Sequence, residues 1–333
     1  MVEFAAMTPL RLILTGFACA LALPATAAAA PPPNDNYLAS TTIQSSNGSM
    51  PREYADSVDT AEATTQPDMF DPNKDGLPFG GGDPEPASCG GAATYGKTAW
   101  WDFRPPSPGG VELKASGGFD VVVAIYQWSA QTSRITRTVT CQNDAQGSET
   151  VLLPEVRKGT NYTVQVGGAG NTGGPVDFEL SYFPDRDGDG VFDALDTCAG
   201  RPGIEAAGGC PPELRSAPRI RYDSIGGGIR ISSLAIDDVP RGARAEVRCR
   251  RCGSKVTRRA TRTGVLSLGR FAGRTVRAGD RIEVRISQGR TGKGRYRFGA
   301  VGKYYRWPVV AGGLGDRVSR CTQPGSRKPV KCR

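Results

Sequence analysis

Five aspartates within residues 185–196 have the spacing of a calcium-binding loop. The segment reads D-R-D-G-D-G-V-F-D-A-L-D. Its carboxylates fall at positions 1, 3, 5, 9 and 12, a glycine at position 6 allows the sharp turn, and position 7 offers a main-chain carbonyl. An acidic solvated turn is the alternative, but so many carboxylates would repel one another without a cation. We therefore expect Ca²⁺ to be bound by Asp185, Asp187, Asp189, Val191, Asp193 and Asp196.

The sequence contains no histidine. This excludes Ser-His-Asp and Cys-His hydrolases, histidine-ligated zinc and histidine proton shuttles. A hydrolase that uses a pair of carboxylates is the alternative, but no two acidic residues stand out in the sequence as a catalytic pair. We expect a protein that is not an enzyme.

The first residues form a secretion signal, residues 1–27. Arg11 precedes an apolar run over residues 12–23, and A-T-A at residues 25–27 is an A-x-A cleavage site. The run is too short to span a bilayer, and no later stretch reaches that length. The mature chain is expected to be secreted, either free or associated with the cell surface.

Cysteine usage agrees with export. Nine cysteines minus Cys19 of the signal leave an even number, which favours disulfides in an oxidising compartment. Sequence alone cannot fix their connectivity. The C-x-x-C at residues 249–252 could also be a redox motif, or a zinc site with the last two cysteines, but a tight disulfide is favoured. Proximity suggests Cys89–Cys141, Cys198–Cys210, Cys249–Cys252 and Cys321–Cys332.

Charge divides the mature chain into three parts. Residues 31–185 have a net charge of −10, residues 186–211 of −3, and residues 212–333 of +22. We expect an acidic domain at 31–184, a calcium loop at 185–211 and a basic domain at 212–333.

Short strand patterns between glycine-rich and asparagine-rich turns predict an all-β protein. The acidic domain is expected to be a jelly-roll or β-sandwich and the basic domain a smaller, Ig-like β-sandwich. In the basic domain, Arg244, Glu246, Arg248 and Arg250 should project from one face of their strand. The predicted strands cover residues 98–103, 110–115, 120–127, 135–141, 150–153, 161–166, 177–183, 220–224, 228–235, 243–250, 264–268, 280–287 and 295–301.

Aromatic residues of the acidic domain could stack on a sugar. Trp100 and Trp101 must point to opposite faces of a strand, so one should be core and the other exposed. Trp128 lies in the same region of the chain. Carbohydrate binding through Trp100, Trp101 or Trp128 is the alternative to a purely structural role.

Three resemblances add to this interpretation. The acidic domain resembles the bacterial pre-peptidase C-terminal domain in N-D-N at residues 34–36, D-P-E-P at 83–86, W-W-D-F-R-P-P at 100–106, G-G-F-D-V-V-V-A-I-Y at 117–126, C-Q-N-D at 141–144 and G-T-N-Y-T-V-Q-V-G-G at 159–168. That family implies a non-catalytic β-sandwich of exported proteins. Residues 185–211 resemble a thrombospondin type 3 repeat, completed by Cys198 and G-G-C-P at 208–211, although Ala199 replaces the usual proline and the repeat is single.

The basic domain resembles an Arg-rich β-domain of exported actinobacterial proteins, with P-R-G-A-R-A-E-V-R-C at residues 240–249 and R-A-G-D-R-I-E-V-R-I at 277–286. No activity comes with this resemblance. The positive charge of the basic domain predicts salt-sensitive attachment to an anionic cell-wall polymer or surface glycan. No motif indicates specific nucleic-acid binding. We expect a calcium-binding surface or cell-wall-associated protein with an adhesive or structural role. The number of calcium ions and the oligomeric state are not set by the sequence.

Overall fold

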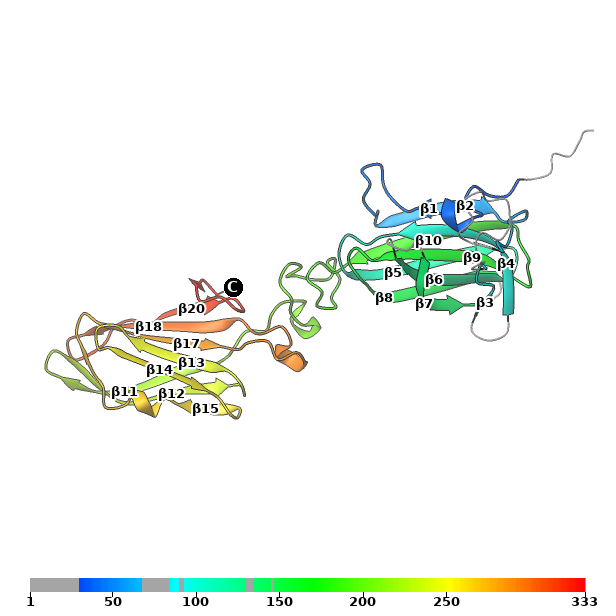
Figure 1. The fold of residues 1–333 in the computed structure, drawn as a ribbon. Coiled ribbons are helices and arrows are strands. Elements are labelled where there is room, and N and C mark those ends of the chain that lie inside the picture. The colour runs from blue at the N-terminus through cyan, green and yellow to red at the C-terminus, as the bar shows by residue number, and fades with distance from the viewer. Residues whose placement is uncertain (1–29, 68–83, 90–92, 130–133, 145–146, 333) are drawn as a thin grey trace, which may run out of the picture.

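The computed structural model describes residues 30–67, 84–89, 93–129, 134–144 and 147–332. The predicted signal peptide lies outside these residues. Within them the protein is all-β, as predicted, with two lobes joined by an irregular segment (Figure 1). No helix in this described part is both long and apolar enough to span a membrane. The helical elements described are the 3-10 turns η1 (Tyr37–Ala39), η2 (Glu205–Ala207), η3 (Gly269–Phe271) and η4 (Gly294–Tyr296).

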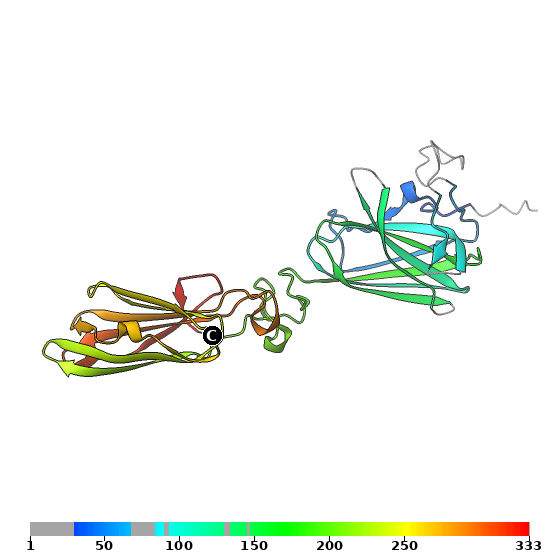
Figure 2. The same cartoon turned by 60° about the horizontal axis from the view of Figure 1, so that its bottom comes forward.

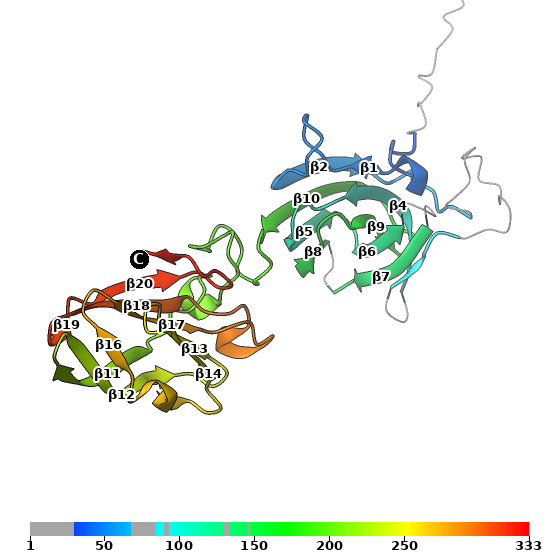
Figure 3. The ribbon, with the colours of Figure 1, turned by 60° about the vertical axis from the view of Figure 1, so that its left-hand side comes forward.

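The acidic lobe corresponds to the predicted acidic domain at residues 31–184, and the basic lobe to the predicted basic domain at residues 212–333. The acidic lobe is a sandwich of two sheets (Figure 3). One sheet has the order β1-β4-β9-β6-β7 with β3 paired to β4, and the other has the order β2-β10-β5-β8. Apolar side chains from alternate positions of both sheets form one buried core between them. The strands are β1 (Thr41–Thr42), β2 (Glu53–Asp59), β3 (Ser88–Cys89), β4 (Ala93–Phe103), β5 (Gly109–Gly117), β6 (Val121–Ser129), β7 (Arg134–Gln142), β8 (Ser148–Val156), β9 (Asn161–Ala169) and β10 (Pro175–Pro184).

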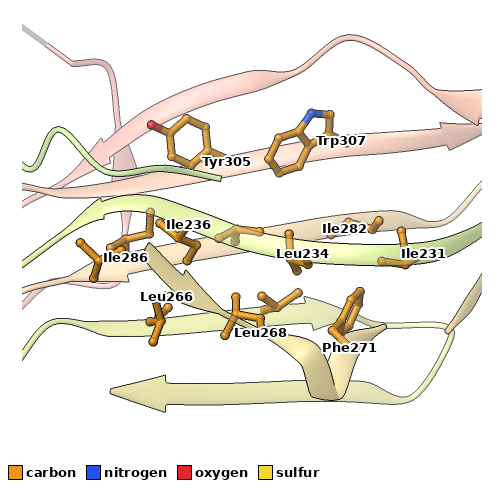
Figure 4. Close-up of a cluster of buried hydrophobic side chains, with 14 of the residues drawn as sticks. Ile231, Leu234, Ile236, Leu266, Leu268, Phe271, Ile282, Ile286, Tyr305 and Trp307 are labelled. Atoms are coloured by element: carbon orange, nitrogen blue, oxygen red, sulfur yellow. The ribbon is translucent and has the colours of Figure 1, made fainter. Parts of the chain in front are cut away.

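The basic lobe is a second sandwich. Strands β11, β12, β15 and β16 form one sheet, and the other has the order β14-β13-β17-β18-β20-β21 with β19 paired to β18. Figure 4 shows the core between these sheets, where Ile236 and Leu234 of one sheet face Ile282, Tyr305 and Trp307 of the other. The strands are β11 (Ala217–Ile225), β12 (Gly228–Val239), β13 (Arg244–Cys249), β14 (Ser254–Arg259), β15 (Gly264–Ser267), β16 (Thr275–Arg277), β17 (Arg281–Ser287), β18 (Gly302–Val310), β19 (Gly313–Leu314), β20 (Val318–Thr322) and β21 (Pro329–Val330).

One predicted strand of the basic lobe is wrong. Residues 295–301 contain part of η4 and irregular chain, and the strand begins only at Gly302. Alternation of arginine with apolar residues continues across that boundary, so the pattern alone could not place it. In β13, Ala245, Val247 and Cys249 are buried in the core. Glu246 lies on the opposite face and is also buried, where Arg248 and Arg327 pair with it.

The four disulfides pair as sequence proximity predicts. They are Cys89–Cys141, Cys198–Cys210, Cys249–Cys252 and Cys321–Cys332. The first joins β3 to β7 across the acidic lobe, and the last closes the C-terminal segment after β20. Cys198–Cys210 closes the irregular segment between the lobes, which bears the predicted calcium loop.

A carboxylate is buried in the acidic lobe. Glu85 is 4% exposed and accepts hydrogen bonds from the Gln66 backbone N–H (2.7 Å), from Gln165 Nε2 (2.8 Å) and from the Thr98 hydroxyl. Burial outweighs these donors and raises the pKa of Glu85 from 4.5 to about 7. The folded state therefore holds a proton that the unfolded chain releases near pH 4.5.

Replacing Glu85 by glutamine should remove a pH dependence of stability. With a raised folded pKa, the contribution of Glu85 is fully present below pH 4.5 and is lost as pH rises through about 7. The free energy of unfolding of the wild-type protein should fall by about 3 kcal/mol relative to Glu85→Gln across that window. Urea titrations at a series of pH values would measure it. Parallel curves for the two proteins would contradict the prediction.

Candidate calcium site

The linker (residues 185–211) begins as β10 ends and follows an irregular path to the basic lobe (Figure 2). The side chain of Asp185, its first residue, is 7% exposed. Its Oδ1 accepts hydrogen bonds from the backbone N–H groups of Gly188 (2.9 Å) and Asp189 (3.2 Å), and its Oδ2 from that of Gly190 (2.9 Å). Gly190 has φ +94°, which glycine adopts without strain. The first predicted ligand thus fixes the turn at the centre of the loop.

Asp189 ties the two halves of the linker together. Its Oδ1 accepts from the Val191 backbone N–H (2.8 Å) and its Oδ2 from the Gly203 backbone N–H (2.7 Å). Asp189 is 8% exposed, so these bonds lie within the folded segment. One oxygen atom from each of Asp185, Asp187 and Asp189 lies within 4.8 Å of the others. The structure therefore brings three predicted ligands into one cluster.

Two members of this acidic group have oxygens that nothing satisfies within the described protein. Both oxygens of Asp187 and Oδ2 of Asp196 are buried and accept no hydrogen bond, whereas Asp196 Oδ1 accepts from the Cys198 backbone N–H (2.6 Å). Buried carboxylate oxygens without partners are costly, and a cation is the group that relieves several at once. The donors are all oxygen, which is the ligand type of calcium and not of zinc or copper. The residues present fit a calcium ion.

The pKa shifts of the clustered carboxyl groups also fit a cation site. Burial, together with the charges of Asp189 and Asp196, raises the pKa of Asp187 to about 6. Burial also raises the pKa of Asp196, and the nearby charges of Asp189 and Asp185 add to the effect. These carboxylates are therefore close enough to destabilise one another when no cation is bound.

Asp193 behaves differently from the other predicted ligands. Its Oδ1 accepts from the Arg186 backbone N–H (2.9 Å) and its Oδ2 from Arg186 Nε (2.8 Å). Burial opposes ionisation of Asp193, but the bonds from Arg186 outweigh it and hold the pKa of Asp193 below its usual value. Position 9 of a calcium loop commonly acts through water, which is compatible with this pairing. Val191 follows Gly190, and its backbone N–H donates to Asp189 Oδ1 (2.8 Å).

The linker packs on the acidic lobe through an aromatic residue. The ring of Phe192 stacks on Phe183 of β10 with centroids 5.5 Å apart. A Cβ atom on Gly110 of β5 would lie 2.7 Å from the Phe192 ring, so only glycine leaves room for it. The Asp185 backbone N–H also donates to the Pro108 carbonyl (2.8 Å). The predicted calcium loop is therefore held against the end of the sandwich.

The other end of the linker packs on the basic lobe. Arg201 Nη1 donates to Gln323 Oε1 (2.8 Å), in the segment closed by Cys321–Cys332. The Leu214 backbone N–H donates to the Val301 carbonyl (3.0 Å), and Lys303 pairs with Glu213. The linker thus contacts both lobes, the acidic lobe through Phe192 and the basic lobe through Arg201.

The predicted sugar-stacking residues are placed mostly inside the protein. Trp100 and Trp101 do point to opposite faces of β4, but both are 0% exposed, so the expected exposure of one of them is wrong. Trp101 lies in the main core, and Trp100 is covered by Tyr37 of η1, whose ring meets it edge-on at 5.4 Å. The segment that precedes the sandwich covers that second face. Trp128, at the end of β6, is half-buried.

Several residues of the linker have roles that the sequence did not reveal. Gly209 must be glycine, because a Cβ atom there would lie 1.9 Å from Asp196 Oδ1. Gly203 donates to Asp189 from outside the loop pattern. Phe192 and Arg201 provide contacts that dock the segment on the two lobes, and Arg186 binds Asp193 within the loop. Of these, only Gly209 occupied a defining position of a motif, the G-G-C-P that ends the repeat; Arg186 and Phe192 stand at unspecified positions of the calcium-loop pattern.

Comparisons with known proteins give distant likenesses. No protein-family model matches the sequence, and no curated protein matches it significantly. The pre-peptidase C-terminal domain of a Bacillus anthracis collagenase is 9% identical with a TM-score of 0.26, over 43% of this chain and 94% of that one. A GH2 β-galacturonidase from Eisenbergiella tayi is 8% identical with a TM-score of 0.20, over 83% of this chain and 44% of that one. Scores this low carry no argument about activity.

Proposed function

We propose that the protein is an exported, non-enzymatic calcium-binding protein of the cell surface. In this proposal calcium stiffens the linker and fixes the angle between the acidic lobe and the basic lobe, and the basic lobe attaches to an anionic polymer of the cell wall. The observation that carries it is the set of buried, unpartnered carboxylate oxygens on Asp187 and Asp196, inside a segment docked on both lobes.

The calcium is proposed to act structurally. Extracellular modules bind calcium with dissociation constants of about 10⁻⁴–10⁻³ M, which external calcium can saturate. Neutralising the carboxylates of the cluster would remove their mutual repulsion and hold the loop closed between its two docking contacts. A stiff joint between oppositely charged lobes keeps them from folding back on one another, which leaves the basic lobe available to a surface.

Attachment of the basic lobe should depend on salt. Purified cell-wall fractions should retain the mature protein at low ionic strength and release it as salt is added, because screening acts over about 8 Å at physiological ionic strength. A pull-down at increasing salt, with calcium held constant, would measure this. Retention that does not change with salt would contradict attachment through charge.

The docking of Phe192 offers a separate test of the joint. Phe192→Ala should leave calcium affinity within about threefold of wild type, or less than about 0.7 kcal/mol, because the side chain supplies no ligand. It should broaden the distribution of distances between the lobes in small-angle scattering with calcium present. Leu195→Ala is the matched control, since Leu195 lies in the same loop and is 75% exposed. Identical scattering of both variants and the wild type would show that Phe192 does not hold the joint.

A further inference from the structure

The outward face of the larger sheet of the basic lobe is a dense array of cations. It is the face opposite to the core residues of β13, β17 and β18. Cross-strand pairing places Lys255, Arg248, Glu283 and Arg306 in one row, and Thr257, Glu246, Arg285, Tyr304 and Arg320 in the next. Arg259 and Arg244 begin a third row. Eight basic side chains share this face with two acidic ones, the eight being Arg244, Arg248, Lys255, Arg259, Arg281, Arg285, Arg306 and Arg320.

Only part of this charge is neutralised. Glu246 pairs with Arg248, Lys255 and Arg327, and Glu283 pairs with Arg281. Among the described residues, Arg244, Arg259, Arg306 and Arg320 have no carboxylate within ion-pair distance, and Arg285 lies over the ring of Tyr304 at 5.4 Å. Like charges at such density destabilise a folded domain. The array is therefore not explained by stability.

The outward face of the opposite sheet provides a comparison within the same lobe. There Arg219 pairs with Asp237 (2.8 Å), and Arg230 lies directly opposite Asp223 across β11 and β12. Arg221 and Arg277 are the other arginines of that sheet's strands, and both are exposed. The larger sheet thus presents eight basic side chains against four, and this excess on one face indicates a surface that meets a polyanion.

At one end of this face lies a cavity of about 230 Å³. Arg244 of β13 and Arg285 of β17 line it on one side, and the C-terminal segment closed by Cys321–Cys332 lines it on the other through Arg327. Figure 1 shows this segment on the side of the lobe that faces the linker. The volume is below that of pockets for drug-sized ligands, about 300 Å³ and more, and suits a single small unit.

The same cavity also offers hydrogen-bond acceptors. Glu246, 4% exposed, contributes carboxylate oxygens, and Arg327 Nη2 donates to both of them (3.0 and 2.8 Å). Gln288, also 4% exposed, lines the cavity, and its Oε1 has no hydrogen-bond partner in the described protein. A bare anion would satisfy the arginines but not Gln288 Oε1, which has no partner. A ligand that carries both an anionic group and hydroxyls satisfies both.

The arrangement of Arg244 and Arg285, neither of which has a carboxylate partner among the described residues, favours phosphate over carboxylate. Arg244 and Arg285 are diagonal neighbours on adjacent strands, with β13 paired to β17. Such neighbours lie about 7–8 Å apart at their Cα atoms, so their guanidinium groups approach a shared ligand from different directions. A tetrahedral oxyanion presents oxygens in different directions, whereas the two oxygens of a carboxylate lie in one plane.

We propose that this cavity binds one unit of a polyol-phosphate polymer and that the cation array of the sheet guides the rest of the chain. This inference rests on the proposed attachment of the basic lobe to an anionic wall polymer and names the chemistry of that polymer. Phosphates of the bound unit meet Arg244 and Arg285, and its hydroxyls donate to Glu246 and Gln288. Further phosphates continue over Arg306 and Arg320.

The test uses the mature protein with calcium and a fluorescent glycerol-phosphate oligomer of about ten units, at about 50 and about 200 mM salt. Arg244→Gln combined with Arg285→Gln should weaken binding about tenfold or more, equivalent to about 1.4 kcal/mol. The matched control, Arg219→Gln combined with Arg230→Gln, removes the same charge from the opposite sheet and should weaken binding less than about threefold. Thermal unfolding of both variants checks that they fold.

Two further probes of equal charge test whether binding depends on the phosphate and hydroxyl groups or on charge alone. Inorganic polyphosphate lacks hydroxyls, and an oligogalacturonate carries carboxylates, so both should bind more weakly than the glycerol-phosphate oligomer. Equal binding of all three probes, or equal losses in both variants, would overturn the proposal, as would no binding of the oligomer. If the oligomer fails to bind while wall fractions still retain the protein in a salt-sensitive way, the cavity assignment is wrong and the proposed function stands.

Discussion

Asp187→Asn should weaken calcium binding about tenfold or more, a loss of about 1.4 kcal/mol, and should stabilise the calcium-free linker. Asp187 is suited to this test because neither of its oxygens accepts a hydrogen bond in the described protein. Its replacement therefore removes a predicted ligand and leaves the hydrogen bonds to Asp185 and Asp189 that hold the loop. Without calcium, the neutral amide also relieves the repulsion that Asp187 experiences from Asp189 and Asp196.

Isothermal titration calorimetry of the mature protein would give the affinity and the number of ions, which a single repeat leaves open. Glu205→Gln is the matched control, because Glu205 is exposed in the same segment and lies outside the acidic cluster. That variant should bind calcium nearly as the wild type does. Equal affinities of Asp187→Asn and Glu205→Gln would show that the cluster is not the calcium site.

Trp101→Ala should destabilise the acidic lobe by about 3–5 kcal/mol, as large aromatic truncations in cores do. Trp101 is 0% exposed and stacks on Phe178 with centroids 4.2 Å apart. Its indole N–H donates to Asp56 Oδ2 (2.9 Å), so the substitution also removes a hydrogen bond from a carboxylate that then keeps only the one from Tyr54 at this oxygen. Chemical denaturation followed by fluorescence would measure the loss.

Trp128→Ala provides the contrast, since Trp128 is only half-buried and should cost about 1 kcal/mol. The pair also addresses carbohydrate binding. A sugar-binding role for the aromatics predicts loss of glycan retention in Trp128→Ala with little change in stability. Unchanged glycan retention in Trp128→Ala, with a large stability loss in Trp101→Ala, fits the core role that burial assigns to Trp101.

Much of the fold follows from local pattern. Strands β5, β6, β9 and β10 alternate apolar and polar residues, or are apolar throughout, between glycine-rich turns, and they were predicted. Strand β2 was missed, because its polar sequence E-Y-A-D-S-V-D pairs only with β10 and shows no continuous apolar face. Strand β14 was missed for a similar reason, since basic and polar residues of an edge strand resemble a turn.

In the candidate site, too, features set by local sequence were predicted and features set by tertiary contacts were not. The acidic cluster was predictable because metal ligands from one short loop have a fixed spacing in sequence. The docking contacts were not, because Phe192 meets Gly110 and Arg201 meets Gln323 across large separations in the chain. The covering of Trp100 by η1 is likewise a tertiary contact, which strand alternation cannot reveal.

Limited proteolysis of the mature wild-type protein, with calcium and with a chelator, tests the proposed joint most directly. Mass spectrometry of the fragments would locate the cuts. With calcium at about one hundred times its dissociation constant, binding should stabilise the closed linker by about 2.7 kcal/mol and slow cleavage within residues 185–211 about 100-fold. Cleavage in that segment at equal rates with calcium and with chelator would contradict a calcium-stiffened joint.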